Sequence, residues 1–132
     1  IRIEIWTRPG GRLGFETVIE ATLSRDPIPG LQIRARDRER DGAVAGMGNV
    51  VLDRAVCIFS DDPDCHAALF GEDAFMETLL EIFAGHPKST FEDRTLKMVC
   101  EGFATLDLDR HIRTTLALIR RLIVFRGQQS VL

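Results

Sequence analysis

The adjacent residues Cys65 and His66 are a thiol and an imidazole that could act together as a nucleophile and its base. A thiol in the first turn of a helix also has a lowered pKa, because the helix N-terminus stabilises the thiolate. The nearby carboxylates of Asp61, Asp62 and Asp64 oppose this effect, since local negative charge raises the pKa of a thiol. We therefore interpret Cys65 as a small, half-buried helix residue and keep a hydrolytic or redox enzyme using this pair as an alternative.

The side chains that most often bind metals are scattered along the chain. The histidines at 66, 86 and 111 show no HxH or HxxxH spacing, and the three cysteines contain no CxxC pair. A zinc site usually draws on such local pairs, although a fold can gather ligands that are distant in sequence. The glycines form neither a phosphate-binding loop nor a nucleophile elbow. The sequence therefore predicts no catalytic residue, no metal site and no cofactor.

Four arginines recur at every second position: Arg34, Arg36, Arg38 and Arg40. If one strand continues through them, all four point to one side and the acidic residues between them point to the other. Such a row could bind phosphates or carboxylates through bidentate contacts. The interleaved acids favour an exposed edge strand that charge protects against association. An anion-binding module that uses these arginines stays an alternative.

Residues 52–85 contain the clearest structural pattern. Between Ala55 and Phe59 both alternating sets of side chains are apolar, which is typical of a strand covered on two sides. Asp62 and Pro63 predict a helix start, because an aspartate accepts bonds from free backbone N–H groups and a proline fits the first helical position. A second helix follows, with Gly85 as its expected left-handed stop. Its apolar face consists of Phe75, Met76, Leu79, Leu80 and Phe83.

Alternating and turn patterns predict two β-hairpins and additional strands. Residues 37–49, which are charged and then rich in glycine, predict a mobile loop. In the last strand, alternate side chains from Leu96 to Cys100 are expected to face inward. The predicted strands are Ile1–Trp6, Leu13–Leu23, Leu31–Arg36, Val50–Phe59, Ser89–Phe91 and Thr95–Glu101.

The last predicted element is a helix from Asp107 or Asp109 to Phe125. Its apolar positions recur at steps of four, three and four, which predicts a face that packs against a sheet. That face consists of Ile112, Leu116, Ile119 and Ile123, widened by Leu118, Leu122 and Phe125. Arginines within this helix argue against a membrane span.

Together these patterns predict a single α+β domain over residues 1–132. The expected architecture is an antiparallel sheet of hairpins with the helices packed on one face and a long C-terminal helix. Runs of strands followed by runs of helices favour this arrangement over repeated βαβ units. Because the chain begins at Ile1, we expect it to be a piece of a longer protein.

Composition and charge restrict the class of protein. The chain is 45% hydrophobic and 28% charged, as in soluble globular proteins, and its net charge of −3 does not favour nucleic-acid binding. Residues 1–60 carry a net charge of +1, residues 61–101 carry −7 and residues 102–132 carry +3. An odd number of cysteines without paired spacing fits a reducing compartment, so we expect a cytoplasmic location.

The run Leu52-Asp53-Arg54-Ala55-Val56-Cys57-Ile58-Phe59-Ser60-Asp61-Asp62-Pro63 resembles a segment of uncharacterised bacterial proteins. Their pattern is a Phe-Asp pair, a short strand, an Asp-Asp-Pro helix start and a Leu-rich helix, followed by a hairpin and a long final helix. Leu52 stands here in place of the usual Phe. The resemblance spans Leu31 to Phe125 and implies a domain from a membrane-associated protein on the cytoplasmic side; it implies no activity.

The sequence thus favours a non-catalytic interaction or scaffold domain with a membrane tether outside this chain. The uneven charge suggests a protein partner or a second copy of the chain as the binding partner.

Overall fold

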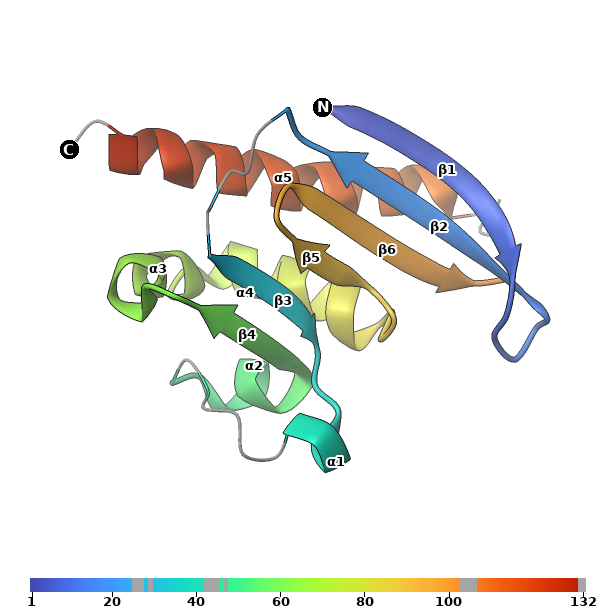
Figure 1. Ribbon diagram of the computed structural model, residues 1–132, viewed down its shortest axis with the longest axis horizontal. Helices are drawn as coiled ribbons and strands as arrows, with labels where there is room; N and C mark the ends of the chain where they lie inside the picture. The colour runs from blue at the N-terminus through green and yellow to red at the C-terminus, as the bar shows by residue number, and fades with distance from the viewer. Residues whose placement is uncertain (25–27, 29, 42–45, 47, 103–106, 131–132) are drawn as a thin grey trace.

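The sheet of this protein has six antiparallel strands in the order β1-β2-β6-β5-β3-β4 (Figure 1). The computed structural model describes residues 1–24, 28, 30–41, 46, 48–102 and 107–130; the side chains of 38–39 and 126–130 lie outside this description. The strands are β1 (Arg2–Pro9), β2 (Phe15–Thr22), β3 (Leu31–Ala35), β4 (Val56–Ser60), β5 (Thr90–Glu92) and β6 (Thr95–Glu101).

Both predicted hairpins are confirmed. In the first, β1 pairs with β2 so that Ile5 lies opposite Ile19. In the second, β5 and β6 are joined through Asp93, which has a positive φ of 56°. The inner face of β6 carries Leu96, Met98 and Cys100, all buried as the alternation predicts. Strand β2 joins the hairpins by pairing with β6, which places Thr17 opposite Cys100.

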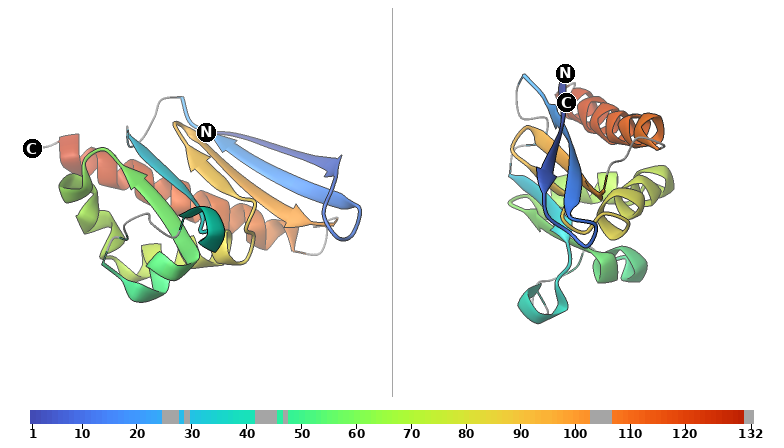
Figure 2. Two further views of the ribbon diagram at one scale, coloured as in Figure 1. Left: turned by 60° about the horizontal axis from the view of Figure 1, so that its bottom comes forward. Right: turned by 90° about the vertical axis from the view of Figure 1, so that its right-hand side faces the viewer.

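The helices are α1 (Arg38–Asp41), α2 (Val50–Ala55), α3 (Pro63–Phe70), α4 (Asp73–Leu79), the π-helix η1 (Leu80–Ala84) and α5 (Leu108–Ser130). Apolar side chains of α2, α3, α4, η1 and α5 form one core with the inner face of the sheet. The view along the molecule in Figure 2 (right) shows helices gathered on one side of the sheet. The predicted α+β class, with helices on one face and a long C-terminal helix, is therefore confirmed.

The start of α3 follows the local sequence signal. The Asp62 side chain accepts a hydrogen bond from the backbone N–H of Cys65 at 3.3 Å, and Pro63 occupies the first helical position. A cap of this kind satisfies a backbone donor that the first helical turn leaves without a partner.

Residues 50–55 were predicted to be strand and are helix α2. The side chain of Asn49 caps the helix by accepting a hydrogen bond from Leu52 N–H at 3.0 Å. Val50 and Val51 have the β-branched side chains that are enriched in strands. They are 66% and 65% exposed, so neither is held in a sheet by burial. The predicted loop at 37–49 likewise contains the short helix α1, while residues 42–45 and 47 of that loop lie outside the described part.

The second predicted helix ends differently from the expectation. It continues from α4 into η1, where Gly85 N–H bonds the carbonyl of Leu80, five residues earlier, at 3.4 Å. Gly85 has a φ of −74°, so the predicted left-handed stop is wrong. A Cβ at Gly85 would lie 2.6 Å from the carbonyl oxygen of Glu81, so the glycine is needed for close approach of the backbone.

Helix α5 is present, but its buried face is rotated from the predicted one. The predicted face includes Ile123, which is 43% exposed, and Ile112, which is only half-buried. The two faces differ because polar residues occupy buried positions in the first turns of α5. A pattern that counts only apolar residues does not assign such residues to the buried face. The buried side chains are His111, Thr115, Leu118, Ile119, Leu122 and Phe125. Within the described ranges, neither α5 nor any other helix combines the length and hydrophobicity that crossing a bilayer requires.

Candidate metal centre

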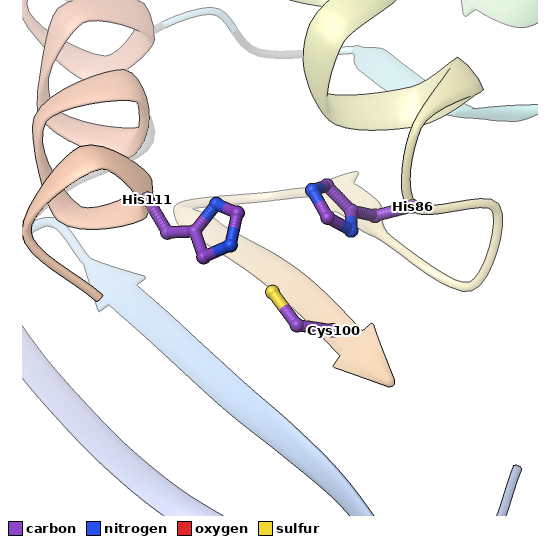
Figure 3. A group of neighbouring side chains, drawn as sticks. All are labelled: His86, Cys100 and His111. Atoms are coloured by element: carbon purple, nitrogen blue, oxygen red, sulfur yellow. The ribbon is translucent and has the colours of Figure 1, made fainter. Parts of the chain in front are cut away.

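Three side chains with metal-binding atoms converge beneath the sheet: His86, Cys100 and His111 (Figure 3). One ring nitrogen from each histidine and the Cys100 Sγ all lie within 4.8 Å of one another. The two imidazole rings meet edge to face, with centroids 5.0 Å apart and planes at 89°. Cys100 and His111 are buried, and His86 is half-buried.

The turn after η1 positions His86. Its backbone N–H donates to the carbonyl of Ile82 at 2.9 Å, and its carbonyl accepts from Ser89 N–H at 2.9 Å. The buried Ser89 hydroxyl then accepts a hydrogen bond from Val99 N–H at 3.0 Å. Because Val99 precedes Cys100 in β6, these bonds fix the turn that carries His86 against the strand that carries Cys100.

Hydrogen bonds at the end of β6 fix Cys100. Thr17, opposite Cys100 on β2, donates from its hydroxyl to the carbonyl of Gly102 at 2.6 Å. Gly102 N–H in turn donates to the carbonyl of Phe15 at 2.7 Å. The pairing with β2 thus continues past Cys100, which keeps its side chain on the helix-covered face.

His111 lies in the first turns of α5, where its N–H donates to the Asp107 carbonyl at 3.0 Å. The rest of the helix is held by its buried apolar face and by an ion pair between Arg121 and Glu72, the residue that precedes α4. The packing of α5 on the sheet therefore sets the position of the His111 ring.

Burial controls the protonation of the cluster. It raises the pKa of the Cys100 thiol to about 11. Burial, together with electrostatic interactions with His111 and Arg110, lowers the pKa of His86, and the nearby Glu81 carboxylate opposes this. Burial therefore favours the neutral thiol of Cys100 and the neutral imidazole of His86. A bound divalent cation would displace the thiol proton, as is general for cysteine ligands.

Two imidazole nitrogens and one sulfur form a ligand set that suits zinc or copper. Zinc in proteins is usually bound by four ligands in a tetrahedron. Three protein ligands therefore leave a fourth position for water, substrate or a further side chain.

No family model, no curated protein and no solved structure matches this chain. Geometry and chemistry therefore carry the assignment of function.

The predicted arginine row does not lie on one strand, because β3 ends at Ala35 and α1 begins at Arg38. Three of the arginines gather instead around the buried Asp41. Arg34 donates two hydrogen bonds of 2.6 Å to the Asp41 carboxylate, and Arg40 Nε lies 3.6 Å from an oxygen of the same carboxylate. Arg36 donates to the Asp41 backbone carbonyl at 2.6 Å. The side chain of Arg38 lies outside the described part. Anion binding by these residues stays a prediction, with the Arg34 guanidinium already engaged by an internal carboxylate.

The Cys65–His66 pair lies on α3. His66 is buried, and its Nδ1 is hydrogen-bonded to the Ser60 hydroxyl at the end of β4. Cys65 is half-buried, as expected for a structural helix residue. Of the three histidines, the fold thus gathers 86 and 111, and His66 is not part of the cluster.

Sequence reasoning missed the cluster, although it contained one signal for it. His111 and Thr115 fall in phase with Leu118, Leu122 and Phe125, so they extend the apolar face of α5 with polar side chains. A polar residue on a buried face requires a partner or a function. The expected inward orientation of Cys100 gave a second ligand, but only the tertiary fold brings the two together.

Proposed function

We propose that this protein is a transition-metal-binding domain in which His86, Cys100 and His111 hold the ion, with Zn²⁺ as the favoured ion. The observation that carries the proposal is the convergence of their ligand atoms within 4.8 Å. These residues come from three separate elements, so the convergence is a product of the fold rather than of a local motif. It replaces the expectation, drawn from sequence spacing, that the chain has no metal site.

The backbone next to His86 supports the proposal. Short π-helical segments are rare and occur often at functional sites. Here η1 lies immediately before the His86 turn, and it is followed by Gly85, where a Cβ would meet the Glu81 carbonyl. The chain therefore adopts an unusual backbone at the point where one ligand is presented.

Titration with Co²⁺, a spectroscopic substitute for Zn²⁺, tests the proposal. We expect the wild-type protein to bind one Co²⁺ with a thiolate-to-cobalt charge-transfer band, and Zn²⁺ to displace it. Cys100→Ser should abolish the band, and His111→Ala should weaken binding by about 100-fold or more, because even outer-shell changes cost 10- to 100-fold. Titration with Cu²⁺ in parallel measures the preference between the two metals.

The matched control is Cys65→Ser, which removes a thiol from α3 and should leave binding and the band unchanged. Circular dichroism establishes that each variant is folded. A folded wild-type protein that shows no charge-transfer band at stoichiometric Co²⁺ would contradict the proposal.

A second candidate is the interaction domain predicted from the sequence, acting in the cytoplasm of a bacterium and tethered to a membrane. The exposed apolar side chains of the β1–β2 hairpin favour it. Ile5 and Phe15 are 44% and 45% exposed, and Leu13 in the turn is 69% exposed. Apolar groups gathered on one hairpin are typical of a protein-binding surface. Self-association measurements, described in the Discussion, test whether a second copy of the chain is the partner.

A further inference from the structure

We propose that Glu81 supplies the fourth ligand of this centre through one carboxylate oxygen. The inference rests on the proposed metal-binding function and names the residue that completes the coordination. The resulting set of two imidazoles, one thiolate and one carboxylate is a chemically normal tetrahedral environment for Zn²⁺.

Glu81 belongs to the helical segment that leads directly into the His86 turn. Glu81 lies within η1 and precedes His86 by five residues. The His86 N–H bonds the carbonyl of Ile82, the residue that follows Glu81, so the His86 turn stays close to the turn of η1 that carries Glu81.

A contact with α5 places the same carboxylate beside the second histidine. Glu81 Oε1 lies 3.4 Å from the hydroxyl of Thr114. Thr114 follows His111 by three residues, and side chains with this spacing are neighbours on a helix surface. The Glu81 carboxylate therefore lies between the two elements that present the histidines.

Reaching the ion requires Glu81 to rotate its side chain, because its oxygens are not among the atoms that converge within 4.8 Å. Little opposes this rotation. The Glu81 side chain is exposed, and the Thr114 hydroxyl also donates to the Arg110 carbonyl at the shorter distance of 3.0 Å. The hydroxyl keeps a partner when the carboxylate moves to a cation.

Other carboxylates near the cluster fit less well. Glu101 follows Cys100 directly in β6, so it points to the opposite face of the sheet. Asp107 contacts the His111 turn through its backbone carbonyl, whereas Glu81 contacts α5 through its carboxylate. Glu77 lies on α4, one helical turn farther from His86 than Glu81.

The test compares Co²⁺ binding by wild-type protein, Glu81→Gln and the matched control Glu77→Gln. Both variants remove one negative charge from neighbouring turns, so a general electrostatic effect would appear in both. We expect Glu81→Gln to weaken binding by about 10- to 100-fold and to change the d–d absorption that reports coordination geometry. The thiolate band should persist, because Cys100 is retained, and Glu77→Gln should resemble the wild type.

The outcomes separate this inference from the proposal on which it rests. A wild-type protein with no thiolate band would overturn both. If the wild type binds Co²⁺ and Glu81→Gln binds within twofold with an unchanged spectrum, only the role of Glu81 is overturned. A loss shared equally by Glu77→Gln would also overturn it, and an Asp107→Asn variant that alone loses affinity would assign the fourth ligand to Asp107.

Discussion

At the scale of single residues, Asp41 shows how a buried charge is satisfied in this fold. Its carboxylate accepts two hydrogen bonds from Arg34 and one from Asp37 N–H at 3.0 Å. These bonds lower its pKa from an ordinary value of 3.8 to about 2. The Arg34 guanidinium also lies over the Phe59 ring, 5.0 Å from its centroid, so the pair joins α1 to the sheet.

Replacing Asp41 with Asn should lower the free energy of unfolding at neutral pH. It should also make that free energy less sensitive to acid. A carboxylate whose folded pKa is lowered contributes stability that is fully present above its unfolded pKa and is lost as pH falls through the folded value. The difference in the free energy of unfolding between wild type and Asp41→Asn should therefore shrink between about pH 4 and pH 2.

Urea denaturation at a series of pH values measures this difference. Asp64→Asn, which removes an exposed carboxylate from the first turn of α3, serves as the control and should keep the wild-type pH dependence. A difference between wild type and Asp41→Asn that stays constant from pH 7 to pH 2 would show that the Arg34 pair does not lower the Asp41 pKa.

The structural role of a residue could be predicted from the sequence where that role depends on neighbours in the chain. The cap at Asp62 and the proline at position 63 depend on neighbours within one turn, and both are confirmed. The cluster of His86, Cys100 and His111 depends on contacts between residues 11 to 25 positions apart in the sequence. Spacing rules for zinc describe local pairs and cannot report ligands that only strand pairing and helix docking bring together.

At the scale of elements, α5 shows which part of an amphipathic pattern is informative. The apolar period predicted a long helix against the sheet, and that helix is present. The face was assigned a few tens of degrees away from the observed one, because the pattern counted apolar residues alone and His111 and Thr115 are buried. The strand predicted at 50–59 is wrong over its first six residues, because Val50 and Val51 are exposed and the Asn49 side chain caps a helix there.

Leu122→Ala and Ile123→Ala separate the observed face of α5 from the predicted one. Leu122 is fully buried, so its truncation should cost about 2–5 kcal/mol of the free energy of unfolding. Ile123 is 43% exposed, so its truncation should cost less than about 1 kcal/mol. Chemical denaturation measures both, and equal losses at the two positions would contradict the observed rotation.

At the scale of the whole molecule, the uneven charge is partly used inside the fold. Residues 61–101 carry −7 and residues 102–132 carry +3. Glu72 from the acidic block forms an ion pair with Arg121 from the basic block. Most of the acidic excess still lies on exposed side chains of α3, α4 and the adjoining turns, where it can act on a partner.

If the interaction proposal is correct and the partner is a second copy, self-association should depend on salt. Exposed charge pairs contribute little affinity each and are screened within about 8–10 Å at physiological ionic strength. We expect sedimentation velocity to show dimers at low salt that dissociate at moderate salt. A monomer at high protein concentration in low salt would remove the homo-oligomer and leave a different protein as the partner.

Metal binding should also stabilise the whole domain, because the proposed ligands exist as a set only when three elements are folded together. An ion that binds the folded state alone stabilises it by about 2.7 kcal/mol at a free concentration of 100 times Kd. For a chain of this size, that corresponds to an increase in Tm of roughly 8–10 °C.

Differential scanning calorimetry with buffered Zn²⁺ should show this increase for the wild type and for Cys65→Ser. Cys100→Ser should show little of it, because its remaining histidines bind the folded and unfolded chains more equally. Equal increases in all three proteins would mean that Zn²⁺ binds elsewhere on the surface, and no increase in any of them would mean that the three side chains pack together without a metal.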